Sequence, residues 1–200
     1  MSSSQPATSP APDQSDNSTS GDNPDIRQQV DQGRGFQKKL ELMIPGLRGY
    51  RSKEDIRVSD DMLRNQVADK IDLAKSNLEG LRKQMVLASD FTNLTTVGSL
   101  ISQFQQLSGQ VRHAEQGYSG WVASISFNDA RLNNLYEYDY NFVSAAFALL
   151  SSTSPPNLSY DPANAASIQP QLQKLQSMLS DIKLKWTQRI EAVENILQSH

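Results

Sequence analysis

Beyond residue 35, most of the chain carries apolar residues at intervals of three and four, the spacing of one face of an α-helix. The clearest run predicts a helix over residues 52–88. Ser52-Lys-Glu-Asp55 has the form of a capping box at its start, although Ser59 offers a second start and leaves a break near residue 58 open. The expected inward positions are Ile56, Leu63, Val67, Ile71, Ala74, Leu78, Leu81, Met85 and Ala88.

The same periodicity predicts four more helices. They cover about residues 36–44, 91–118, 129–151 and 168–198, with a long Ser-, Pro- and Asn-rich linker over 152–167. Arg189 interrupts the apolar seam of the last helix, while Ile190 and Leu197 appear beside it. This drift of the seam around the helix favours a globular bundle over a two-stranded coiled coil. The expected fold is therefore all-α: a four-helix bundle with long helices and a short extra N-terminal helix.

The N-terminal residues differ in kind from the rest. The first 25 residues contain only Met1, Ala7 and Ala11 as apolar residues, among many Ser, Pro, Asp, Gln and Asn. Such a segment cannot bury enough surface to offset the entropy of ordering it. We expect a disordered acidic and polar tail over 1–34 and a helical bundle over 35–200; the tail either solubilises the chain or carries a partner-binding motif.

Residues 34–51 are locally basic, with five cations against Glu41 alone. Lys38 and Lys39 lie here among the apolar residues of the predicted short helix. One interpretation lays this segment on an anionic membrane surface. The other, which we favour, lets it close one end of the bundle and leaves its lysines in solvent.

No segment is expected to cross a membrane, because the longest apolar run, over 142–150, falls far short of the roughly 20 residues that a spanning helix needs. The N-terminus has neither the basic start nor the apolar stretch of a secretory signal. The chain also has no cysteine, which excludes disulfides and thiolate chemistry and suits a reducing compartment. A cytoplasmic location is expected.

Composition and motifs give little support to catalysis, cofactors or nucleic-acid binding. The net charge of -3 is too mild to indicate a nucleic-acid partner. With two histidines and no Glu-x-x-His pair, a helical metal site lacks ligands, and no Gly-rich phosphate loop occurs. We expect no metal, no cofactor and no enzymatic activity.

One polar cluster stands out. Asp139 falls on the apolar seam of the 129–151 helix, where a carboxylate must be paired, protonated or turned toward water. The candidate partners are Arg112 and His113. The pair either fixes helix register, which we favour, or forms a ligand pocket beneath Trp121. Trp121 and the nearby Tyr118 are also candidates for aromatic residues at a contact surface.

Two stretches carry a resemblance. Ile44-Pro-Gly-Leu-Arg-Gly-Tyr50 runs into Lys-Glu-Asp-Ile-Arg57, and Ala114-Glu-Gln-Gly-Tyr-Ser-Gly120 runs into Asn-Asp-Ala-Arg-Leu132 and Leu-Tyr-Glu-Tyr-Asp139. Over about residues 44–140 the chain resembles a group of bacterial all-helical proteins with no assigned function. The resemblance implies a bacterial cytoplasmic helical domain and carries over no catalytic residue.

These patterns together predict a non-enzymatic helical module for protein interaction or scaffolding, which binds a protein partner or associates with itself. The alternative is a peripheral membrane or envelope-associated factor that uses the basic segment 34–51. An enzyme ranks third.

Overall fold

In a computed structural model of the chain, the residues described are 26–47, 49, 53–114 and 129–198. Within these ranges all regular structure is helical, so the chain is all-α. The helices are α1 (Ile26–Met43), α2 (Lys53–Leu87), α3 (Leu94–Arg112), α4 (Asp129–Thr153), a 3-10 helix (Pro162–Ile168) and α5 (Gln169–Gln198).

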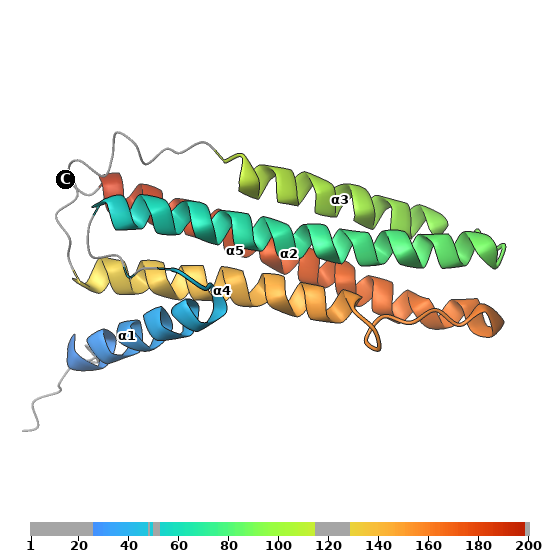
Figure 1. Ribbon diagram of the computed structural model, residues 1–200, viewed down its shortest axis with the longest axis horizontal. Coiled ribbons are helices and arrows are strands. Elements are labelled where there is room, and N and C mark those ends of the chain that lie inside the picture. Colours follow the sequence, from blue (N-terminus) through green and yellow to red (C-terminus); the bar gives the residue numbers. More distant parts are fainter. Residues whose placement is uncertain (1–25, 48, 50–52, 115–128, 199–200) are drawn as a thin grey trace, which may run out of the picture.

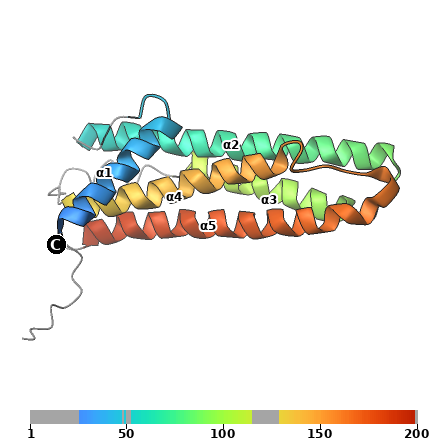
Figure 2. The ribbon, with the colours of Figure 1, turned by 90° about the horizontal axis from the view of Figure 1, so that it is seen from below.

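Helices α2 to α5 run lengthwise beside one another, and α1 lies obliquely against α4 (Figures 1 and 2). α2 packs on α3 and α4, and α5 packs on the same two helices from the other side. The α2–α3 connection and the start of α5 lie at one end of the molecule. The start of α2 and the end of α5 lie at the other.

The predicted inward positions form most of the core. In α2 the run from Leu63 to Met85 is buried at every predicted position, whereas Ala88 is exposed because α2 has already ended at Leu87. In α5 the seam is buried from Ile168 to Trp186. The 3.6-residue period therefore identified which side of each long helix faces the core.

α2 is one continuous helix of 35 residues, about 52 Å long, without the break considered near residue 58. It ends in a Schellman motif: the Asp90 N–H donates to the Met85 carbonyl, and the Ser89 N–H donates to the Val86 carbonyl. Ser89 takes the left-handed conformation of this motif, with φ of 55°. The motif turns the chain sharply into α3.

Three predicted boundaries were wrong. α1 begins at Ile26 rather than near residue 36, so the predicted tail over 1–34 is too long; residues 1–25 lie outside the described ranges. Ile26 and Val30 already extend the helical spacing upstream. α3 ends at Arg112 rather than near 118, and part of the predicted 152–167 linker is the 3-10 helix. Asp161 caps that helix by accepting a hydrogen bond from the Ala163 N–H at 2.9 Å.

Candidate functional site

Asp139 lies in a buried polar cluster whose centre is Arg189 on α5. The Arg189 Nε donates to the Asp139 Oδ1 on α4 at 2.5 Å, and its Nη2 donates to the Asp60 Oδ1 on α2 at 2.5 Å. All three residues are buried. The Trp186 ring lies 5.8 Å from the guanidinium carbon of Arg189. One side chain thus joins three helices in the core.

Arg64 extends this network to the fourth long helix. Its Nε donates to the Asp60 Oδ2 at 2.8 Å, and its Nη2 bonds Asp61. Its Nη1 donates to the main-chain carbonyls of Arg112 and Ala114, at 3.3 and 3.0 Å. A cation at the C-terminus of α3 also complements the helix dipole.

The prediction that Asp139 is buried and paired is confirmed, but both predicted partners were wrong. Arg112 instead donates from its Nη2 to Asp69 at 2.9 Å and to Asp72 at 2.8 Å, both on the solvent side of α2. The hydrogen bond to Asp69 contributes most to a raised pKa of Arg112, and the bond to Asp72 raises it further. The side chain of His113 is exposed. The signal for the true partner was Arg189 itself, a charge on the inward seam of the last helix.

The buried network is suited to holding helices in register. Arg64 and Arg189 each bond two carboxylates, so their charges are compensated inside the fold. No group of three or more His, Cys, Asp or Glu side chains that could hold a metal ion occurs in the part of the chain that the structure describes. In the same part, no helix is both long enough and apolar enough to cross a membrane.

The basic segment lies mainly in α1, and its apolar face is turned inward. Leu40 and Ile44 are fully buried. Lys38 and Lys39 are both exposed, and the Nζ of Lys39 lies 5.5 and 5.3 Å from the ring centres of Phe36 and Tyr140. The apolar residues of this segment therefore belong to the core, as the favoured interpretation expects. α1 packs along α4, however, and does not close one end of the bundle. Tyr118 and Trp121 lie outside the described residues.

Sequence reasoning missed a second region, at the end of the α2–α3 hairpin. Leu87 is 87% exposed and Phe91 is 68% exposed, and Val86 beside them is half exposed. We call these three residues the hairpin-end patch. Part of the signal was in the sequence, since Val86 and Leu87 fall off the inward seam of α2. Phe91 lies in the turn between α2 and α3.

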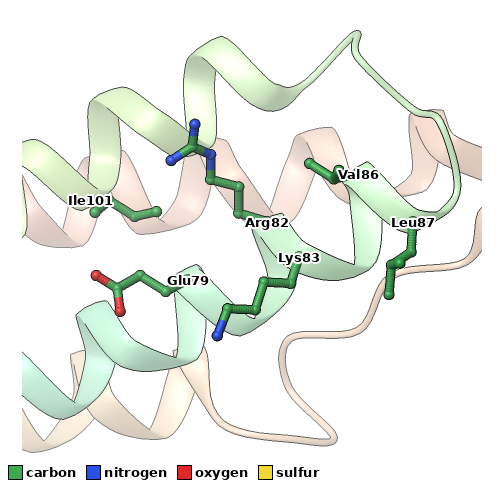
Figure 3. A pocket seen from close by; sticks show the side chains of 6 residues that line it. All are labelled: Glu79, Arg82, Lys83, Val86, Leu87 and Ile101. Atoms are coloured by element: carbon green, nitrogen blue, oxygen red, sulfur yellow. The ribbon is translucent and has the colours of Figure 1, made fainter.

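An open groove of about 620 Å³ adjoins this patch between α2 and α3 (Figure 3). Its lining is Glu79, Arg82, Lys83, Val86, Leu87 and Ile101. The Arg82 side chain points toward α3, and the Lys83 ammonium lies on the other side of α2. Neither cation has an ion-pair partner among the described residues. The groove thus combines mainly apolar walls with two cations and one carboxylate, that of Glu79.

A smaller recess of about 230 Å³ lies between the start of α3 and the start of α5. It is lined mostly by amides, and Asn93 there donates to the Ala165 carbonyl at 3.2 Å. The Gln169 amide in turn donates to the Asn93 side-chain oxygen at 3.4 Å. These amides bond one another and serve to join the two helix ends.

Comparison with known proteins gave no match to any protein-family model, curated protein or solved structure.

Proposed function

We propose that this chain is a non-enzymatic helical interaction module. In this proposal α2 to α5 form a four-helix bundle that acts as a stiff frame, and the α2–α3 hairpin carries the binding surface. The observation that carries it is the hairpin-end patch. Three large apolar side chains stand exposed within six residues of sequence, beside an apolar groove. Clustered exposed apolar residues of this kind are typical of protein contact sites.

The buried charges support the same proposal. In the core, bonds connect four charged residues: Asp60, Arg64, Asp139 and Arg189. Their role is therefore to hold helices together, and no catalytic role is needed to explain them. The resemblance of residues 44–140 to bacterial helical proteins supports a bacterial, cytoplasmic location, which is also part of the proposal.

Affinity purification of the tagged full-length protein from its native cells, followed by mass spectrometry, tests the proposal. We expect a partner that co-purifies with the wild type and is lost with a Leu87→Glu/Phe91→Glu variant. Leu42→Glu is the matched control, because Leu42 is 79% exposed but lies on α1, away from the patch. Recovery of the same proteins with all three forms would contradict the proposal.

A peripheral membrane role is the second candidate, and one observation favours it: Lys38 and Leu42 are both exposed on α1. Against it, Leu40 and Ile44 are already buried and leave little apolar surface for lipid. Flotation with neutral and anionic vesicles separates the two candidates. Salt-sensitive binding to anionic vesicles that Lys38→Glu abolishes would favour the membrane.

A further inference from the structure

The outer side of α2 carries a regular set of residues that are exposed or partly exposed. We call Leu73, Ser76, Gly80, Lys83 and Leu87 the outward stripe of α2; their spacing of three and four places them on one side of the helix. Its two leucines are 52% and 87% exposed. The core residues of α2, from Leu63 to Met85, lie on the opposite side.

The neighbouring helices hold α2 by its flanks and leave this stripe to solvent. On one flank Arg112 of α3 bonds Asp72, and it also reaches Asp69, one turn before Leu73. On the other, Asn77 donates to the Thr153 hydroxyl at the end of α4 at 3.3 Å. α2 accordingly runs along one edge of the molecule (Figure 2).

The outward stripe has a symmetry that matches a second copy of itself. Leu73 and Leu87 lie equally far from Gly80 along the helix, on either side of it. If two α2 helices cross antiparallel at Gly80, each Leu73 meets the Leu87 of the other copy. A side chain built at Gly80 would meet no atom within 4 Å, so the backbone there is open to close approach. A two-fold contact requires this kind of self-complementary surface.

The charges around Gly80 are complementary in the same arrangement. Glu79 and Lys83 lie one turn apart on the exposed side of α2, and neither has an ion-pair partner among the described residues. Antiparallel crossing brings each Glu79 near the Lys83 of the other copy, twice over by symmetry. The wall of the groove at Val86 and Leu87 then receives the other copy's Leu73.

We propose that the chain forms an antiparallel homodimer through the outward stripe of α2, with Gly80 at the crossing point. The inference rests on the proposed function and names its partner: a second copy of this chain. Contacts limited to one helix face and its rim fall at the small end of interface sizes, where complexes are transient. The dimer is therefore concentration-dependent.

Sedimentation velocity of the full chain over a concentration series, with charge-reversed variants, tests this arrangement. We expect Glu79→Lys and Lys83→Glu each to weaken self-association at least about tenfold, because like charges then face each other. An equimolar mixture of the two variants should recover dimers, since every facing pair in the mixed dimer is again of opposite sign. Leu87→Glu should abolish the dimer, and Leu42→Glu on α1 should leave it unchanged.

All substituted side chains are exposed, so each variant should keep the wild-type thermal unfolding midpoint, which circular dichroism checks. A wild type that stays monomeric at every concentration would overturn the homodimer. Self-association without recovery in the mixture would overturn the antiparallel crossing. A monomer that still retains a different partner through Leu87 would overturn only this inference and leave the proposed function standing.

Discussion

Arg189 lies on the inward side of α5, where an unpaired guanidinium would carry a large desolvation penalty. Its bonds to Asp139 and Asp60 compensate that charge and connect α5 with α4 and α2. The pattern of the sequence predicted the burial of Asp139, because helical periodicity depends only on neighbours along the chain. The identity of its partner depends on how helices far apart in sequence are arranged, and periodicity contains no such information.

The Asp139–Arg189 bond leads to a prediction at the residue scale. Asp139→Ala should lower the free energy of unfolding by about 3–5 kcal/mol, because it leaves a buried arginine with one bond fewer. Asp69→Ala is the control: its bond to Arg112 is exposed, and its loss should cost at most about 1 kcal/mol. Urea unfolding measures both. Purely additive effects in a double-mutant cycle with Arg189→Met would contradict the pairing.

Tyr160 provides a second residue-scale prediction, on pH. Partial burial, together with the hydrogen bond that its hydroxyl donates to Asp90 Oδ2 at 3.0 Å, raises the pKa of Tyr160 above its ordinary value of 10.0. The folded state therefore holds this proton more tightly than the unfolded state. Its contribution to stability is present below pH 10 and is lost as the pH rises through the folded-state pKa.

Ultraviolet titration of the tyrosines checks this shift. The phenol of Tyr160 should ionise at higher pH than a free tyrosine, and Tyr160→Phe should remove that component. Asp90→Asn should move it to lower pH, because the variant removes the neighbouring negative charge. An unchanged titration in Asp90→Asn would show that the hydrogen bond does not govern the pKa of Tyr160.

At the scale of elements, long helices with strict apolar spacing were the easiest to predict. α2 follows its predicted range of 52–88 closely. Its many regularly spaced apolar residues determine both which side of the helix is buried and how far the helix extends. The beginning of α1 was missed because Ile26 and Val30 are the only apolar residues in its first ten, so that this part resembles the polar tail before it. Packing of a later apolar face stabilises such a helix, and its propensity alone does not indicate where it begins.

α1 permits a test on two leucines of the same helix. Leu40 is fully buried, whereas Leu42 points into solvent. Leu40→Ala should therefore lower the free energy of unfolding by about 2–5 kcal/mol, since it removes core contacts and leaves a cavity. Leu42→Ala should change it by less than about 0.5 kcal/mol. Equal effects of the two substitutions would mean that α1 does not pack through the Leu40 face.

At the scale of the whole molecule, two groups of charged residues have different roles. In the core, the Asp60–Arg64–Asp139–Arg189 network holds the four long helices together, with each of its arginines bonded to two carboxylates. On the surface, Arg82 and Lys83 lie beside exposed apolar side chains and have no ion-pair partner within the described part of the chain. The first arrangement supports the frame, and the second is the region that we assign to binding.

Sequence reasoning anticipated a polar cluster and a basic segment, but it did not find this surface. The outward residues of a helix are identified as a binding region by what leaves them uncovered, and that depends on the placement of α3 and α4. A periodic pattern treats Leu73 and Leu87 as irregularities, although together they mark the uncovered side of α2.

The claim that this surface carries binding is tested most directly by site-specific photo-crosslinking in living cells. A benzophenone amino acid would replace Leu87 in one form of the protein and Leu42 in the other, both at exposed positions. We predict a discrete crosslinked product from position 87, which Glu79→Lys weakens, and none from position 42. No product at 87, or products of equal yield from both positions, would contradict the account.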